Sequence, residues 1–205
     1  MSIKQATTDH PIHELLSRRW SPYAFTDRDV STDELCAVFE AARWAPSSYN
    51  EQPWSYVAAV RSDAEAFERL LSCLVEANQV WACHAPVLAL GIIRETFAHN
   101  GKPNAAARHD LGLAAGNLLA EATARGLAVH QMIGILPDRA RELYAIPEHS
   151  MALTALAIGH AGDPASLPEG LRERDLAPRT RKPLAEFVFG GRWGEPSNLV
   201  SSPPR

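Results

Sequence analysis

"AAARHDLGLAAGNLLAEATARG", residues 105–126, carries the most regular pattern in the chain. Its apolar side chains recur at helical spacing over three turns: Leu111, Ala114, Ala115, Leu118, Leu119 and Ala122. This spacing predicts a long helix with one face on the protein core, and Gly126 is placed to end it. A second face carries small residues, among them Gly112 and Gly116, which let another backbone approach closely. We therefore expect a central helix that either packs tightly within the chain or lies at a subunit interface.

Shorter segments of helix and strand character surround this helix. Strands are expected at 54–60, 86–93, 127–131 and 153–159, where β-branched, aromatic or continuous apolar residues gather. Helices are expected at 9–19, from Ser31 to Pro46, over 62–81 and from about Pro137, with the pairs Ser31/Glu34 and Ser62/Glu65 as capping boxes. No glycine-rich turn of the dinucleotide-binding type joins a strand to a helix, which disfavours a Rossmann fold. The pattern predicts one α+β domain over residues 1–195, with a C-terminal arm after Asp163 and a mobile tail at 196–205.

Composition restricts the class of protein. The chain has 205 residues, of which 46% are hydrophobic and 21% charged, as expected for a globular domain with its own core. A net charge of -4 gives no global attraction to nucleic acid, and the apolar run 86–93 is too short to span a membrane. The three cysteines are an odd number without metal-type spacing, and the first twenty residues lack a secretory pattern. We expect a cytoplasmic protein that binds neither nucleic acid nor membrane.

Familiar catalytic constellations are weak in this sequence. There is no Gly-x-Ser-x-Gly elbow, which disfavours a serine hydrolase. His10 and His13 are three residues apart, and Cys83 adjoins His84, but such isolated pairs do not make a closed metal site. We predict no metal and no side chain that acts as an obligatory catalyst.

Two other features point to a ligand. The connection "APSSYNEQPW", residues 45–54, offers a hydroxyl, amide or carboxylate at nearly every position, which suits either a solvated turn or the lining of a flat, polar-edged ligand. Arginines gather beside small polar residues in three segments, 18–25, 178–183 and 191–194. Each cluster alone is typical of a solvated face, but three together suggest a bound anion, because a guanidinium offers a fork of donors suited to phosphate.

These segments, taken in order, resemble the FMN-dependent nitroreductase family over most of the chain. The family opens with one or two basic residues, a Ser and then a basic residue before Ala-Phe, a pattern that "RRWSPYAF" at 18–25 resembles. Its Pro-Ser-Ser-x-Asn-x-Gln-Pro-Trp signature matches Pro46 to Trp54. A later helix with Asn-Leu-Leu and a closing Gly-Leu resembles Asn117 to Leu127, and the following loop resembles "HQMIGI" at 130–135. The resemblance implies a nitroreductase-like fold, with a central, mainly antiparallel sheet flanked by helices.

The resemblance also implies an FMN site. The cofactor-binding residues it transfers to this chain are Arg18, Arg19, Trp20, Ser21, Ser47, Ser48, Asn50, Gln52, Asn78, Met132, Ile133, Gly134, Arg179 and Arg181. Among these, Arg19 and Ser21 would hold the phosphate or the ribityl and pyrimidine edge, while Arg179 and Arg181 would face the phosphate. Residues 47–52 would follow the isoalloxazine and ribityl chain, Asn78 would contact the ring system, and residues 132–134 would run beside the reactive nitrogen. Two positions depart from the family pattern. Tyr23 stands where a basic residue is common near the flavin pyrimidine, and Ile133 stands where some members have Glu or Gly.

The implied function is an FMN-dependent oxidoreductase. It would use NAD(P)H to reduce nitroaromatics, quinones or related electron-poor small molecules by ping-pong hydride transfer, as a homodimer with the flavin where the subunits meet. An alternative stays open: a flavin-binding storage or sensor protein with little turnover, which the Tyr23 departure favours.

Overall fold

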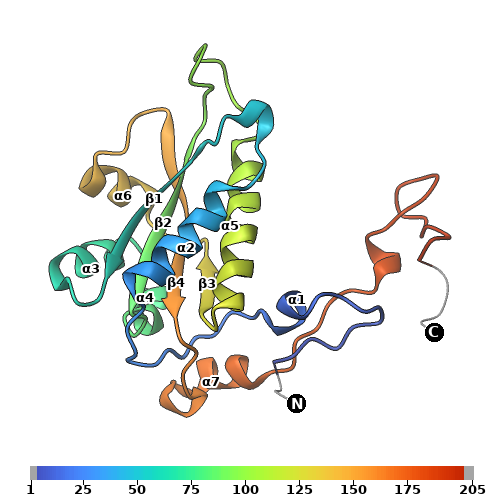
Figure 1. Cartoon of the computed structure of the whole chain (residues 1–205), viewed down its shortest axis with the longest axis horizontal. Helices are drawn as coiled ribbons and strands as arrows, with labels where there is room; N and C mark the ends of the chain where they lie inside the picture. The colour runs from blue at the N-terminus through green and yellow to red at the C-terminus, as the bar shows by residue number, and fades with distance from the viewer. Residues whose placement is uncertain (1–3, 201–205) are drawn as a thin grey trace.

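The computed structural model describes residues 4–200 and contains a four-stranded antiparallel sheet (Figure 1). The strands are β1 (Trp54–Val60), β2 (Val87–Arg94), β3 (Ala128–Met132) and β4 (Ser150–Gly159), in the order β1-β2-β4-β3. β2 and β4 are central, and seven of the eight residues of β2 are buried. This is why β2 reads in the sequence as a continuous apolar run rather than an alternating one.

Helices cover both faces of the sheet, so the fold has three layers (Figure 1). On one face lie α2 (Thr32–Arg43) and α5 (Ala107–Ala124), packed on Val87 and Ala89 of β2. On the other face lie α3 (Ala64–Leu71), α4 (Glu76–Ala82) and α6 (Pro137–Tyr144), packed on Leu88 and Leu90. Alternate residues of one strand thus serve two cores, as the pleat requires. The α+β fold with an antiparallel sheet between helices is confirmed.

The long helix predicted around residues 105–126 is α5, and its core face buries Ala114, Leu118 and Ala122 as expected. Its small-residue face is open within this chain. A Cβ atom added at Gly112 or Gly116 would meet no other atom within 4 Å. Tight packing inside the chain therefore does not explain these two glycines.

Several predicted boundaries were wrong. The first helix, α1 (Glu14–Arg18), begins after His13 rather than at Asp9, and the His13 ring nitrogen accepts the Leu15 N–H at 3.2 Å. The helix expected over 62–81 is divided into α3 and α4, and its cap is Asp63 rather than Ser62. The division has a tertiary cause, because residues 73–75 use their backbone groups on residues 134–136, including a Val75 N–H to Gly134 carbonyl bond of 3.1 Å.

The C-terminal arm contains a helix that sequence periodicity missed, α7 (Glu169–Leu176), between two short 3-10 turns, η2 (Pro164–Ser166) and η3 (Leu184–Glu186). Beyond α7 the chain leaves the body, and its described part runs away from the sheet (Figure 1). This arm folds on itself through a bridge between Phe189 and Pro196, while Trp193 is 92% exposed. The domain bounds and the tail at 196–205 stay predictions, and residues 201–205 lie outside the described part.

Two findings concern the cysteines and possible membrane-spanning helices. Cys36, Cys73 and Cys83 are free thiols. Within residues 4–200, no helix has the length and apolar character needed to cross a bilayer. The cytoplasmic location itself stays a prediction.

Candidate functional site

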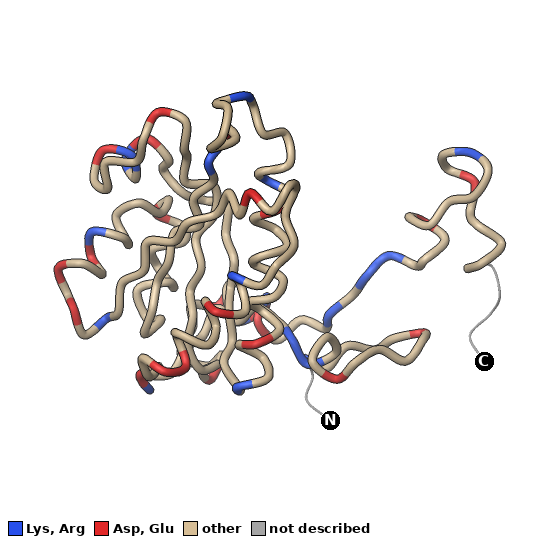
Figure 2. Tube along the Cα trace, turned by 45° about the horizontal axis from the view of Figure 1, so that its top comes forward, with Lys and Arg blue, Asp and Glu red and all other residues tan. Residues whose placement is uncertain are grey.

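Guanidinium groups from the two ends of the chain meet beside the last turn of α5. Arg19 lies just after α1, and its Nη1 donates to Ser21 Oγ at 3.1 Å. Burial lowers the pKa of Arg19, and the nearby charges of Arg179 and Arg181 lower it further. Arg179 in turn has its pKa lowered by burial and by Arg181. Figure 2 shows the basic residues of the arm beginning next to those of the N-terminal segment.

This cation cluster, defined as Arg19, Arg179 and Arg181, has no carboxylate counter-ion among residues 4–200. Within the described residues, no carboxylate lies within ion-pairing distance of any of the three guanidiniums. Partly buried like charges are costly unless an opposite charge compensates them. The cluster therefore has the chemistry of an anion site, and the hydroxyl of Ser21 adds a further donor.

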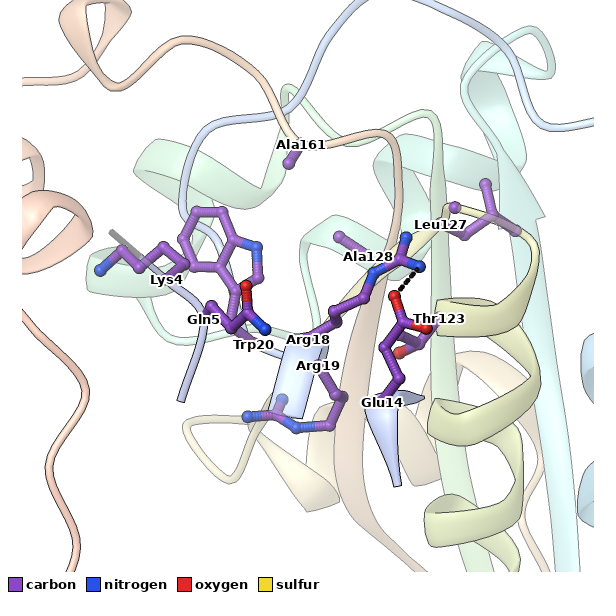
Figure 3. Close-up of a pocket in the computed structure, with 11 residues that line it drawn as sticks. Lys4, Gln5, Glu14, Arg18, Arg19, Trp20, Thr123, Leu127, Ala128 and Ala161 are labelled. Atoms are coloured by element: carbon purple, nitrogen blue, oxygen red, sulfur yellow. Dashed lines mark hydrogen bonds and ion pairs between the residues drawn. The ribbon is translucent and has the colours of Figure 1, made fainter. Parts of the chain in front are cut away.

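A pocket of about 420 Å³ adjoins the cation cluster, because Arg19 is part of its lining. Its lining is Lys4, Gln5, Glu14, Arg18, Arg19, Trp20, Thr123, Gly126, Leu127, Ala128 and Ala161. Figure 3 shows Arg18 turned toward Glu14, with which it pairs at 3.2 Å, while Arg19 extends the other way. The Lys4 Nζ lies 5.0 Å from the centroid of the Trp20 ring. Arg18, Arg19 and Trp20 thus all line the pocket, and Arg19, which is hydrogen-bonded to Ser21, also belongs to the cation cluster.

The polar connection between α2 and β1 contains the 3-10 turn η1 (Ser48–Asn50) and is conformationally unusual. Tyr49, Asn50 and Gln52 all have positive φ, between 49° and 54°, although none is glycine. The Gln52 N–H donates to Ser47 Oγ at 2.9 Å, and Gln52 Nε2 donates to the Asn50 carbonyl at 3.1 Å. Several residues in a sparsely populated backbone region are a mark of functional sites, because the surrounding structure must hold them there.

Two carboxylates that sequence reasoning did not single out hold this connection. Asp110, in the first turn of α5 and 2% exposed, accepts the Ser48 N–H at 3.1 Å. Glu51 accepts the Ala98 N–H at 2.7 Å and pairs with Arg94 at the end of β2. The Ala98 N–H, followed by the charge of Arg94, lowers the pKa of Glu51. An acidic residue in a helix's first turn is the one sequence signal that Asp110 gives.

The third group of predicted residues follows β3. Asn78 of α4 donates from Nδ2 to the Gly134 carbonyl at 2.9 Å, so it braces the loop 132–135. A Cβ at Gly134 would lie 2.5 Å from that Nδ2, so only glycine fits there without displacing Asn78. Ile133 is 82% exposed, which leaves the loop surface free to face a ligand.

The structure keeps these groups at different places along α5. Ser48 is tied to Asp110 in the first turn, whereas the pocket of Arg18 and Arg19 reaches Thr123 in the last. Thirteen residues at a rise of about 1.5 Å separate the two points by roughly 20 Å. Within one chain, the connection 47–52 and the cation cluster are therefore not adjacent.

The Tyr23 side chain packs against other aromatic rings of the protein. Its ring packs edge-on against Trp81, with centroids 5.2 Å apart, and against His130 at 4.7 Å. The His130 ring nitrogen Nδ1 lies 2.8 Å from the Pro22 carbonyl, and burial lowers the pKa of His130. Tyr23 thus fixes the segment after Arg19 to the core. In the described residues, no group of three or more His, Cys, Asp or Glu side chains is placed to hold a metal ion.

Comparisons with known proteins agree on one family. The sequence model of the Nitroreductase family matches residues 16–160. A solved oxidoreductase containing FMN is 38% identical, with a TM-score of 0.86 over 91% of this chain and 95% of its own. A nitroreductase family protein of Clostridium difficile is 25% identical, with a TM-score of 0.68 over 87% of this chain and 96% of its own. A Streptomyces coelicolor protein described as a candidate NADH dehydrogenase/NAD(P)H nitroreductase is 31% identical over 163 residues, covering 70% of this chain and 80% of the relative. The chain belongs to the Nitroreductase family.

Proposed function

We propose that the protein is an FMN-dependent oxidoreductase that uses NAD(P)H to reduce electron-poor small molecules such as nitroaromatics and quinones. The observation that carries the proposal is the cation cluster of Arg19, Arg179 and Arg181, which has no carboxylate partner in residues 4–200. A phosphate supplies the missing negative charge. The FMN named for the 38% identical structure carries such a phosphate at the end of a ribityl chain, whose other end bears a planar ring.

Different groups of residues in this chain would bind different parts of the cofactor. The cation cluster and Ser21 would bind the phosphate, while Ser47, Ser48, Asn50 and Gln52 would line the ring edge and ribityl chain. Residues 132–134, braced by Asn78, would hold a backbone N–H beside the ring. The chemistry that FMN supplies is ping-pong hydride transfer from NAD(P)H to the acceptor. Hydride transfer of this kind would need no obligatory side-chain acid or base.

A homodimer would bring the separated groups together. The connection 47–52 and the cation cluster lie roughly 20 Å apart on one chain, so a second copy is needed to supply the missing half of one site. The open face at Gly112 and Gly116 offers a surface for that copy. Next to it, a groove of about 320 Å³ is lined by Leu15, Ala41, Trp44, Asn117, Ala120 and Glu121. Light scattering tests this part, and a monomer at micromolar concentration contradicts it.

The proposal is tested first by spectroscopy. Purified protein, before and after incubation with excess FMN, should show the absorbance bands of bound flavin. NADH and NADPH oxidation is then followed with menadione and with a nitrofuran as acceptors. A preparation that stays colourless contradicts the FMN assignment, whereas turnover with either acceptor supports the oxidoreductase.

Arg19→Ala tests the phosphate site itself. Loss of one charge-assisted hydrogen bond, at about 1.5–3 kcal/mol, predicts FMN affinity roughly 10- to 150-fold weaker. Riboflavin, which lacks the phosphate, should bind both proteins alike. Arg18→Ala is the matched control, because Arg18 turns away and pairs with Glu14, and it should change FMN affinity little. Equal effects of the two substitutions on FMN affinity would remove Arg19 from this role.

A second candidate function is favoured by one observation. Tyr23 occupies a position that is often basic in the family, and its ring is packed on Trp81 instead of offering a positive charge. Less positive charge near the ring would disfavour the anionic reduced flavin. A storage or sensor protein follows if FMN binds tightly while NAD(P)H oxidation stays at the rate of free FMN.

A further inference from the structure

Asp175 is a buried carboxylate for which the proposed function has no direct use. It lies in α7 and is 1% exposed. Its Oδ1 accepts the Tyr23 N–H at 3.0 Å, and its Oδ2 accepts the Ala24 N–H at 3.4 Å. Burial of a carboxylate destabilises the fold unless its oxygens accept hydrogen bonds. Because both oxygens of Asp175 accept from one backbone segment, they fix that segment firmly.

The segment that Asp175 holds leads directly into the cation cluster. Residues 19–24 carry Arg19 and Ser21, which are bonded to each other at 3.1 Å. The same segment is held from the sheet side, where the Gly162 N–H donates to the Ala24 carbonyl at 2.8 Å. Asp175 is the contact that comes from the C-terminal arm. It therefore couples the position of Arg19 to the position of the arm.

The arm is in turn fastened to the N-terminal segment just after this contact. Lys4 Nζ donates to the Ala177 carbonyl at 2.7 Å, just after α7. Two residues further on, Arg179 Nη1 donates to the carbonyls of Lys4 at 2.9 Å and Ser17 at 2.7 Å. Asp175 lies only four residues before Arg179. Fixing Asp175 against residues 23–24 therefore limits how far Arg179 can move.

Mutual repulsion acts against this assembly. The three guanidiniums of the cation cluster carry like charges and repel one another. Without a contact between the two segments, repulsion would let the arm move outward and spread the donors. The backbone bonds of Asp175 oppose that movement from inside the core, where solvent screens them little.

We propose that Asp175 is a positioning residue for the phosphate subsite: it holds Arg19 and Ser21 at the distance from Arg179 and Arg181 that one phosphate can span. The proposal rests on the proposed FMN function. Asp175 does not touch the ligand itself, so its effect should be confined to the phosphate half of the cofactor. A purely structural carboxylate would instead weaken the binding of any flavin equally.

The test compares FMN with riboflavin on Asp175→Asn, which keeps the shape but loses the charge and one acceptor. We expect FMN affinity to fall about tenfold or more, the loss of one charge-assisted contact, while riboflavin affinity changes less than about twofold. Asp163→Asn is the matched control, because Asp163 caps η2 at Ala165 N–H and an Asn caps equally well. It should leave both affinities unchanged.

The outcomes separate this inference from the function beneath it. Equal losses for both flavins, or no loss for either, overturn the positioning role while the wild-type protein still binds FMN. A wild-type protein that binds neither flavin overturns the proposed function and this inference together. If Asp175→Asn does not fold, Asp175→Glu keeps the charge but displaces it by a methylene, and an FMN-to-riboflavin affinity ratio equal to that of the wild type overturns the proposal.

Discussion

Gly134→Ala perturbs the loop beside the proposed flavin ring at one defined point. A Cβ there would lie 2.5 Å from Asn78 Nδ2 and 2.9 Å from Val75 Cγ2, both closer than real contacts allow. The φ of Gly134 is not positive, so the alanine backbone itself is unstrained and the effect is steric. Asn78 must swing aside, which breaks its 2.9 Å bond to the Gly134 carbonyl.

The expected magnitude follows from three opposing contributions. Overpacking of this kind costs about 1–3 kcal/mol, and the lost hydrogen bond costs about 1 kcal/mol. Replacing glycine stabilises by about 0.4–1 kcal/mol through the unfolded chain. The net prediction is a free energy of unfolding lower by about 1–3 kcal/mol, which corresponds to a Tm lower by roughly 2–10 °C for a domain of this size.

Denaturant unfolding of the flavin-free protein measures this difference. Gly170→Ala is the matched control, because a Cβ at this exposed position in α7 meets nothing within 4 Å, and it should raise stability by about 0.5–1 kcal/mol. In an Asn78→Ala background the cost of Gly134→Ala should shrink, because the nearest obstacle is gone. A Gly134→Ala protein as stable as the wild type would refute the reasoning about this loop.

Two further predictions concern stability away from the site. Ala145 follows the last residue of α6 with φ 49° and ψ 42°, so Ala145→Gly should raise the free energy of unfolding in urea by up to about 1 kcal/mol. The control Ala37→Gly, inside α2, should lower it by about 1 kcal/mol. A change of the same sign in both variants would contradict this prediction. Burial raises the pKa of Tyr56 from 10.0 to about 12, and its hydroxyl has no partner in the described residues. Between these values the unfolded chain loses the phenolic proton first, so stability should fall as pH rises through 10 to 12, by at most about 1.4 kcal/mol per pH unit. Tyr56→Phe should remove that part of the decline, and an unchanged alkaline profile would argue against a buried hydroxyl.

Local signals in the sequence accounted for the elements whose causes are local. The capping box of Ser31 and Glu34 forms as expected at the start of α2, and the apolar run of β2 gives a central strand. The break between α3 and α4 was missed because its cause lies about sixty residues away, in the backbone of residues 134–136. The helix α7 was missed because it buries only Asp175 and so has no apolar stripe to detect.

In the candidate site, too, features with local sequence signals were predicted and features with distant causes were not. The resemblance pointed to the arginines and the polar connection, and it assigned Arg18 and Arg19 to the same cofactor. In the structure, the side chains of these two arginines extend in different directions (Figure 3). The supporting carboxylates Asp110 and Asp175 could not be found, because nothing in a sequence distinguishes a buried aspartate from a solvated one. Their importance appears only when a distant backbone segment donates to them.

The family match ends at residue 160, yet the cation cluster is completed by Arg179 and Arg181 beyond it. The sheet and its helices alone would offer a phosphate only Arg19 and Ser21. The arm adds two cations, and it does so against their repulsion, so the free protein holds an electrostatic strain that a bound anion removes. Under the proposed function, folding of the arm onto residues 17–24 and binding of a phosphate would be coupled, because an anion that binds only the assembled cluster stabilises it by mass action. The arm would then be part of the binding site, although it lies outside the sheet that defines the fold.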